Sequence, residues 1–304
     1  MNVMNTTLRR TALFTFGALL SLACTRTNND APAGSGSSSA GGGGTAQNKG
    51  ALTVKGSDTM VILGQRWAEA YMKKNPQVSV QVTGGGSGTG IAALIDGGTD
   101  VCNASRPMTD KEKADVQLKR GAPAIETKVA LDALAVYVHE ENPIDTIDLG
   151  QLSAMYLGQT TNWKDVGGKD EKIVLYGREN NSGTYGYFKE HVLANKDFAA
   201  EVQSLSGTSA VVNAVKGDPR GIGYGGIAYA SGIRLLKVKK TKDAAAVEPK
   251  ESTALDGSYP ISRYLFVYTA GEPRGTVKDF IQWILSNEGQ GVVKDVGYFP
   301  LPKP

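Results

Sequence analysis

Glycine, serine and threonine gather at four points where a predicted strand ends and a predicted helix begins. These segments are residues 56–59, 84–90, 103–106 and 178–184. Glycine lets the backbone approach a ligand closely, and serine and threonine add hydroxyl donors. The first N–H groups of a helix have no partner inside the helix and carry partial positive charge. Together these features predict a binding site for an anion.

Any one of these junctions is weak evidence, because serine and threonine are favoured at helix N-termini for capping alone. Four junctions in one chain, with Arg178 four residues before Ser182, favour a ligand site. The guanidinium would add a full positive charge to donors that carry only partial charge.

The elements that must position these segments alternate between strands and helices. Strands are predicted at residues 52–54, 78–82, 127–131, 133–138, 172–176 and 264–268. Helical patterns begin near Met60, at Thr109, where Glu112 completes a capping box, and near Thr276, with Gly289 at the end of the third helix. This alternation predicts an α/β fold with mostly parallel sheets.

The first 24 residues have the pattern of an export signal. Arg9 and Arg10 precede an apolar stretch, residues 12–22, about half as long as a membrane span. Residues 20–24 resemble a bacterial lipobox, in which Cys24 is lipidated and becomes the mature N-terminus, although Ser21 replaces an aliphatic residue. Plain secretory cleavage is the alternative, and a cytoplasmic helix is disfavoured. We expect a periplasmic or cell-surface protein that touches the membrane only through its lipid.

Residues 25–50 are rich in glycine, serine and alanine and contain no aromatic residue, which predicts a flexible tether. The rest of the chain is long enough for two domains. With Cys24 lipidated, Cys102 has no partner and is expected to be a small buried hydrophobe. The net charge of +3 disfavours a nucleic-acid binder.

Other chemistries fit the sequence less well. Residues 84–90 lack the Gly-Lys-Ser/Thr ending of a phosphate-binding loop, and an exported protein would meet little dinucleotide. A serine hydrolase needs a catalytic base, yet His139 and His191 stand in no recognisable catalytic context. Two cysteines and two histidines leave little for a metal site. The sequence therefore predicts binding rather than catalysis, with no metal and no cofactor.

From about Leu52 to Phe299 the chain resembles the phosphate-specific solute-binding proteins of bacterial ABC importers, the PstS type, in their shorter subtype. The order and spacing of the matching motifs are specific. They are Gly-Ser-Asp-Thr at 56–59, the glycine-rich run at 81–91, Asn-Ala-Ser-Arg-Pro-Met at 103–108, Arg178 with Ser-Gly-Thr-Tyr at 182–185, the segment 210–224 and Tyr-Pro-Ile-Ser-Arg at 259–263.

The resemblance implies an α/β, two-domain, periplasmic-binding-protein-like fold of type II, with mixed sheets flanked by helices and the ligand in the cleft between the domains. Domain 1 would be residues 51–134 plus 261–304, and domain 2 residues 135–260. Segments 130–138 and 263–268 would cross between them, so that the domains close on the ligand like a hinged clamp.

Carried over residue by residue, the family's binding positions imply phosphate contacts from Thr59, Ser87, Ser105, Arg178, Ser182, Gly183 and Thr184. Their neighbours Ser57, Asp58, Gly88, Thr89 and Arg106 complete the predicted site. We expect Ser87 and Thr184 to donate through hydroxyl and backbone. Arg178 would supply the one full positive charge on a planar fork suited to two oxygens, unless it forms an ion pair with Glu179 or Glu190 instead.

Arg106 departs from longer members of the family, in which an aspartate at this position accepts the proton of bound phosphate. Asp58 is the candidate substitute, because a carboxylate repels sulfate but accepts a hydrogen bond from a phosphate that still carries a proton. The alternative is that Asp58 merely caps the helix near Thr59. Arg106 is expected either to contact phosphate or to form an ion pair with Asp58.

These observations predict a lipid-anchored receptor, monomeric, that delivers inorganic phosphate to the permease subunits of an ABC importer. Two other classes stay open. The same scaffold could hold another tetrahedral oxyanion, such as sulfate or molybdate, or the chain could be an exported phosphatase or hydrolase that uses Ser87 or Ser182. A phosphate sensor without a role in transport is a further alternative.

Overall fold

The structure is a computed structural model that describes residues 50–302. The predicted signal peptide, the lipidation of Cys24 and nearly all of the predicted tether lie outside the described residues. Gly50, the last residue of that tether, is the first residue of strand β1. Within residues 50–302, no helix has the length and apolar character required to cross a bilayer.

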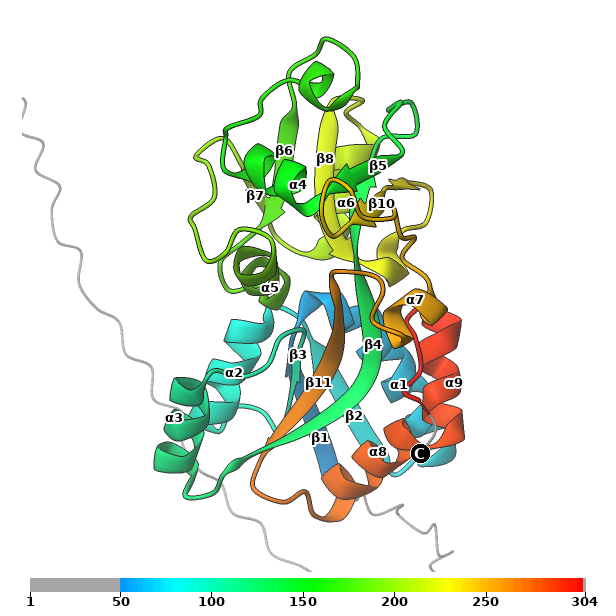
Figure 1. The fold of residues 1–304 in the computed structure, drawn as a ribbon. Coiled ribbons are helices and arrows are strands. Elements are labelled where there is room, and N and C mark those ends of the chain that lie inside the picture. The colour runs from blue at the N-terminus through cyan, green and yellow to red at the C-terminus, as the bar shows by residue number, and fades with distance from the viewer. Residues whose placement is uncertain (1–49, 303–304) are drawn as a thin grey trace, which may run out of the picture. The chain divides into compact units, whose positions relative to one another are not determined.

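The described residues are organised around a nine-stranded mixed sheet (Figure 1). Its order is β2-β1-β3-β11-β4-β8-β6-β7, with β9 paired to β4. The bounds are β1 (Gly50–Gly56), β2 (Val78–Thr83), β3 (Val101–Ala104), β4 (Ala124–Val138), β6 (Val174–Arg178), β7 (Gln203–Leu205), β8 (Gly221–Gly226), β9 (Arg234–Leu235) and β11 (Ser262–Ala270). Strands β5 (Thr146–Asp148) and β10 (Lys237–Lys239) form a separate parallel pair.

Helices cover this sheet on both sides of β1 to β3, with α1, α8 and α9 on one side and α2 and α3 on the other (Figure 1). The bounds are α1 (Val61–Lys74), α2 (Ser87–Asp96), α3 (Asp110–Arg120), α4 (Leu149–Tyr156), α5 (Gly183–His191), α6 (Thr208–Lys216), α7 (Glu251–Leu255), α8 (Gly275–Leu285) and α9 (Asn287–Val296), with the short 3-10 helices η1 (Asp58–Met60), η2 (Trp163–Val166) and η3 (Ile227–Tyr229). The predicted α/β fold, a mixed sheet flanked by helices, is confirmed.

Strand β4 joins the two halves of the sheet. The sequence predicts two strands here, but residues 124–138 form one. Its first part pairs antiparallel with β11, from Ala124 opposite Ala270 to Ala133 opposite Ser262. Its last part pairs antiparallel with β8, beginning at Leu134. The predicted domain boundaries lie beside this change of partner, and the division into two hinged domains stays a prediction.

Parallel pairing is confined to β1, β2 and β3 and to β6, β7 and β8, so the prediction of mostly parallel sheets holds for these strands but not for the mixed sheet as a whole. Strand β1 pairs parallel with β2 and β3, and β6 pairs parallel with β7 and β8. The antiparallel pairs all involve β4 or β11. Because parallel strands end at one edge of a sheet, the loops that follow β1 and β3 lie side by side there.

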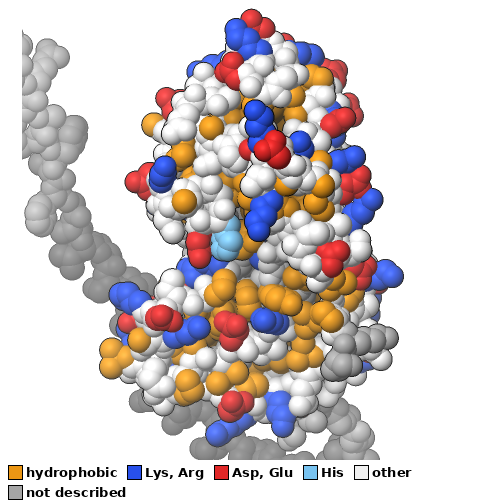
Figure 2. Space-filling view, in the orientation of Figure 1, with side chains coloured by type: hydrophobic (Ala, Val, Ile, Leu, Met, Phe, Trp, Pro, Cys, Tyr) orange, Lys and Arg blue, Asp and Glu red, His pale blue; other side chains and the backbone are white. Residues whose placement is uncertain are grey.

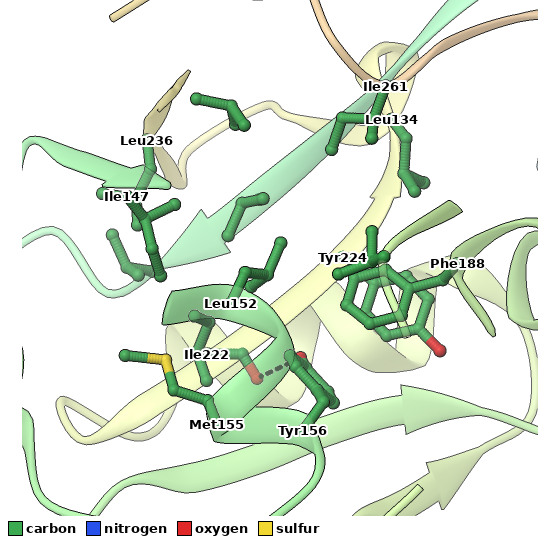
Figure 3. Packing of buried hydrophobic residues seen from close by; sticks show 14 of the residues in the cluster. Leu134, Ile147, Leu152, Met155, Tyr156, Phe188, Ile222, Tyr224, Leu236 and Ile261 are labelled. Atoms are coloured by element: carbon green, nitrogen blue, oxygen red, sulfur yellow. Dashed lines mark hydrogen bonds between the residues drawn. The ribbon is translucent and has the colours of Figure 1, made fainter. Parts of the chain in front are cut away.

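Aromatic side chains form much of the core beneath the second half of the sheet (Figure 3). Tyr224 of β8 stacks on Phe188 of α5, with ring centroids 3.9 Å apart. The ring of Tyr156 meets both at steep angles, and its hydroxyl donates to the carbonyl oxygens of Tyr176 and Ile222. Each such ring removed from water contributes about 1.5–3 kcal/mol. This packing holds α4 and α5 against β6 and β8.

Several predicted roles are architectural, as expected. Trp67 and Tyr71 are buried against α8 and α9, and Trp163 is buried with its indole N–H donating to the Arg220 carbonyl. Cys102 is buried and forms no disulfide with a described residue, and burial raises the pKa of its thiol. His191 lies on the exposed face of α5.

One predicted helix end is confirmed by the structure, and another is not. The capping box of α3 is confirmed, since the Thr109 hydroxyl accepts from the Glu112 N–H and the Glu112 carboxylate accepts from the Thr109 N–H. The prediction of a single C-terminal helix that ends at Gly289 is wrong. Helix α8 stops at Leu285 because Ser286 caps a new helix, α9, with its hydroxyl accepting from the Gly289 N–H.

Charges of both signs are interspersed on the face shown in Figure 2, and no large area of that face carries one sign alone. That face shows no basic stripe of the kind typical of nucleic-acid-binding surfaces.

Candidate functional site

The four glycine, serine and threonine segments lie together. Residues 56–59 and 103–106 follow the neighbouring parallel strands β1 and β3, residues 84–90 lead into α2, and residues 178–184 run from β6 into α5. Most of the predicted polar side chains in these segments are almost completely buried. They are Ser57, Thr59, Ser87, Ser105, Arg178, Ser182 and Thr184. The structure thus assembles most of the predicted site from both halves of the sheet.

Helices α2 and α5 meet at their N-termini. A Cβ placed on Gly183 would lie 2.3 Å from Ser87 Oγ and 2.7 Å from Ser105 Oγ, so only glycine fits there. The Gly88 N–H donates to the Asn181 carbonyl at 2.9 Å. Both helix ends carry partial positive charge, so this arrangement concentrates positive potential between them. Such a pair of helix ends is suited to hold one anion.

Hydroxyl groups gather where the helix ends meet. Thr59 Oγ1 and Thr184 Oγ1 are 2.8 Å apart, and Ser87 Oγ and Ser105 Oγ are 3.3 Å apart. Ser105 N–H also donates to Ser87 Oγ. Ser57 Oγ is buried and has no hydrogen-bond partner among the described residues. A hydroxyl rotates to suit its neighbour, so these groups can donate to an anion.

Arg178, the last residue of β6, is 2% exposed and belongs to this cluster. Its guanidinium donates to Asp58 Oδ2 at 2.8 Å and to Thr208 Oγ1 at 2.9 Å. Burial lowers the pKa of Arg178, and the Asp58 carboxylate opposes that shift. The alternative ion pair of Arg178 with Glu179 or Glu190 is wrong, because its carboxylate partner is Asp58.

Asp58 joins the glycine-rich segment to Arg178. Its Oδ1 accepts from the Gly85 N–H at 2.7 Å, and its Oδ2 accepts from Arg178. The side chain is 21% exposed, so it lies at the edge of the buried cluster. The alternative that Asp58 merely caps the helix near Thr59 is wrong, because both oxygens bind partners far away in the sequence.

Arg106 pairs with Glu112 instead of Asp58. Its two terminal nitrogens donate to the two carboxylate oxygens of Glu112 at 2.8 and 2.7 Å. The predicted ion pair between Arg106 and Asp58 is therefore wrong. Glu112 competes successfully because the capping box already holds its carboxylate in the first turn of α3. A contact between Arg106 and a ligand stays a prediction.

Two predicted residues of α2, Gly88 and Thr89, bond to the glycine-rich segment and to the loop before α5 rather than to the buried hydroxyls. The Thr89 hydroxyl is exposed and donates to the Gly85 carbonyl at 2.6 Å. Gly88 uses its N–H for the Asn181 carbonyl. Asn181, which the sequence analysis did not select, also donates from its side chain to the Gly85 carbonyl at 2.9 Å. These bonds join the glycine-rich segment to the loop before α5.

The sequence analysis also missed a buried ion pair beside the cluster. Arg263 is 5% exposed and Asp132 is fully buried, and Arg263 Nε and Nη2 donate to Asp132 Oδ2 at 3.0 and 2.9 Å. Burial raises the pKa of Asp132, and Arg263 opposes that shift. A signal was available, because an aspartate inside the apolar run of β4 needs a buried partner. Arg263 ends the motif 259–263, which carries part of the family resemblance but predicts no contact for the arginine.

The two buried arginines thus each face a carboxylate. Arg178 pairs with Asp58, and Arg263 pairs with Asp132. These four groups cancel in formal charge, so partial charges and hydroxyl donors would carry most of the attraction for an anion. Among residues 50–302, no group of three histidine, cysteine, aspartate or glutamate side chains could hold a metal ion.

Comparison with known proteins identifies relatives over most of the chain. A family model described as the PBP superfamily domain matches residues 41–288. The phosphate-binding protein PstS of Pseudomonas aeruginosa is 37% identical over 270 residues, which cover 83% of this chain and 84% of the relative. The phosphate-binding protein PstS of Staphylococcus saprophyticus is 35% identical over 268 residues, which cover 85% of this chain and 83% of the relative.

Solved structures agree with this similarity. A Clostridium perfringens structure, described as a phosphate ABC transporter substrate-binding protein with bound phosphate, superposes with a TM-score of 0.76 at 29% identity. The match covers 83% of this chain and 100% of that one. An ABC-type phosphate transport receptor of Vibrio cholerae has a TM-score of 0.67 at 26% identity, over 83% of this chain and 100% of that one.

Two glycines of α5 offer a matched test of the contact between the helix ends. We expect Gly183→Ala to push α5 away from Ser87 and to speed hydrogen exchange of the Gly88 amide, because its bond to the Asn181 carbonyl opens. Gly186→Ala is the control, since its Cβ would lie 3.4 Å from the flexible Arg106 side chain. Hydrogen exchange measured by NMR compares the two variants. Unchanged protection of Gly88 in Gly183→Ala would contradict this view of the site.

Proposed function

We propose, from the premise that this chain belongs to the PstS-type phosphate-binding proteins of the PBP superfamily, that it captures inorganic phosphate outside the cytoplasm. The observation that supports this most is the meeting of α2 and α5, end to end, among buried hydroxyls. A tetrahedral oxyanion presents oxygens in several directions at once. It can therefore accept from both helix ends and from the hydroxyls between them.

In this proposal the backbone N–H groups of Gly183 and Thr184 donate to phosphate from one side. The hydroxyl and N–H of Ser87 donate from the other side, with Thr59 and Ser105 completing the ring of donors. Arg178 adds its guanidinium, whose Nε is buried without a hydrogen-bond partner among the described residues. No bond is broken, so the chain acts as a receptor rather than an enzyme.

Asp58 would select phosphate over sulfate. Its carboxylate lies beside Arg178 and, among residues 50–302, accepts one other hydrogen bond, from the Gly85 N–H. A carboxylate oxygen has more than one lone pair, so Asp58 can accept the proton that phosphate carries near neutral pH. Near neutral pH sulfate has no proton to donate, so the Asp58 carboxylate would only repel it.

Release would follow from opening of the two predicted domains about β4 and β11. Contacts that join the two halves of the sheet, such as Asp58 with Arg178 and Thr59 with Thr184, would then break. Closure excludes water and strengthens the interactions with the anion. The released phosphate would pass to the permease subunits of an ABC importer. The receptor would be held near that permease by a lipid on Cys24 and by the tether.

Calorimetric titration with phosphate, arsenate and sulfate tests the function and the role of Asp58 together. We expect phosphate and arsenate to bind, and sulfate to bind roughly 10⁴-fold more weakly. Asp58→Asn should narrow the gap between phosphate and sulfate by at least about tenfold, because the negative charge that repels sulfate is removed and the single amide oxygen that remains is a weaker acceptor for the phosphate proton. The matched control is Asp197→Asn, at a side chain that is 91% exposed. If the wild-type protein binds sulfate as tightly as phosphate, the phosphate assignment is contradicted. If the ratio of phosphate to sulfate affinity is unchanged in Asp58→Asn, the proposed role of Asp58 is contradicted.

The anchoring proposal concerns Cys24 and needs its own measurement. Mass spectrometry of the protein from its native membrane should find a mature chain that begins at an acylated Cys24. Cys24→Ser should abolish acylation and release the protein from the membrane. Cys102→Ser should leave both unchanged, because Cys102 is buried in the folded protein. A mature N-terminus at another residue, without acyl groups, would support plain secretory cleavage instead.

A further inference from the structure

Arg263 and Asp132 lie where β4 changes its pairing partner. The two residues are opposite each other in the β4–β11 ladder. Two positions later, Leu134 begins the ladder with β8. Asp132 also accepts, through Oδ1, from the Ile227 N–H that follows β8. The carboxylate therefore ties β11 to the end of β8 at the point where the two halves of the sheet join.

Arg263 reaches from this point into the candidate site. Its Nη1 donates to the Ser105 carbonyl at 3.0 Å, and its Nη2 donates to Thr184 Oγ1 at 2.9 Å. Its guanidinium carbon also lies 5.3 Å from the ring centre of Tyr187, in α5. One side chain on β11 thus contacts the loop after β3 and the first turn of α5. Asp132 holds that side chain from behind.

The bond to Thr184 determines what the threonine hydroxyl can do. A hydroxyl has one proton to donate and two lone pairs that accept. Because Arg263 always donates, it occupies one lone pair of Thr184 Oγ1. The hydroxyl proton must then point elsewhere, toward Thr59 Oγ1 at 2.8 Å or toward a ligand. Arg263 therefore prepares Thr184 as a donor.

We propose that Arg263 is a positioning residue of the phosphate site, which orients the Thr184 hydroxyl to donate to the anion and is itself held and neutralised by Asp132. This inference rests on the proposed function of the site. Its distinguishing feature is that Arg263 acts through Thr184. The effect of Arg263 on affinity must then depend on the presence of the Thr184 hydroxyl.

A double-mutant cycle on phosphate affinity tests that dependence. Arg263→Met is combined with Asp132→Asn, so that no unpaired charge is left buried and the Asn oxygen still accepts from the Ile227 N–H. In the wild-type background we expect this pair of changes to weaken phosphate binding roughly tenfold or more. In a Thr184→Val background, the same changes should weaken the remaining affinity less than about threefold. Calorimetry measures all four proteins, and circular dichroism checks that each one is folded.

Two further variants keep the test decisive. Arg66→Met makes the same side-chain change at an exposed position of α1 and should leave affinity unchanged. Arg263→Lys retains the charge opposite Asp132 but cannot donate to Asp132, Thr184 and Ser105 in one plane. We therefore expect it to weaken phosphate binding in the wild-type background, where the Thr184 hydroxyl is present. In the Thr184→Val background it should barely change phosphate affinity. If the charge-neutral pair does not fold, this lysine variant completes the cycle.

The outcomes separate the inference from the proposed function. Equal losses of affinity with and without the Thr184 hydroxyl would overturn the positioning role, even if phosphate binds well to the wild-type protein. No loss of affinity in the wild-type background would overturn it as well. If the wild-type protein takes up no phosphate in the first titration, the proposed function fails, and the inference fails with it.

Discussion

Two helix N-termini, those of α2 and α5, are held against each other in the interior of the protein. Their partial charges have the same sign, so the contact is electrostatically unfavourable by itself. It is maintained because β4 joins the two halves of the sheet, because Gly183 allows the backbones to approach, and because the Gly88 N–H bonds to the Asn181 carbonyl. An anion placed between the helix ends converts this repulsion into attraction on both sides. In the proposed function, binding and closure would then be one event.

Each guanidinium of the site is paired with a carboxylate, so neither arginine by itself would decide which anion binds in the proposed function. Arg178 faces Asp58, and Arg263 faces Asp132, so neither guanidinium is an uncompensated attractor for any divalent ion. Discrimination is left to hydrogen bonding, in which a missing proton or a misdirected donor costs far more than a difference in size. The same pairs span the two halves of the sheet or lie at their junction. The groups that would select the anion are therefore also groups that would respond to closure.

The parts of this structure that were predictable are the ones encoded locally. Glycine and hydroxyl residues mark the strand-to-helix junctions directly, so residues 56–59, 84–90 and 178–184 were identified correctly as segments that meet. The partners of charged side chains were not predictable, because Arg178 and Asp58 are 120 residues apart and Arg263 and Asp132 are 131 apart. Arg106 was misjudged for the opposite reason, since a local carboxylate six residues away satisfies it. The predicted ligand contacts, hinged domains and lipid anchor await experiment.

The most direct test of the central claim is a crystal structure grown with arsenate, which can be located by its anomalous scattering. The account predicts a single strong peak between the first turns of α2 and α5, within hydrogen-bond distance of Ser87 Oγ, Thr184 Oγ1 and the backbone nitrogens of Gly183 and Thr184. A peak elsewhere on the protein, or helix ends that point away from the ion, would contradict it.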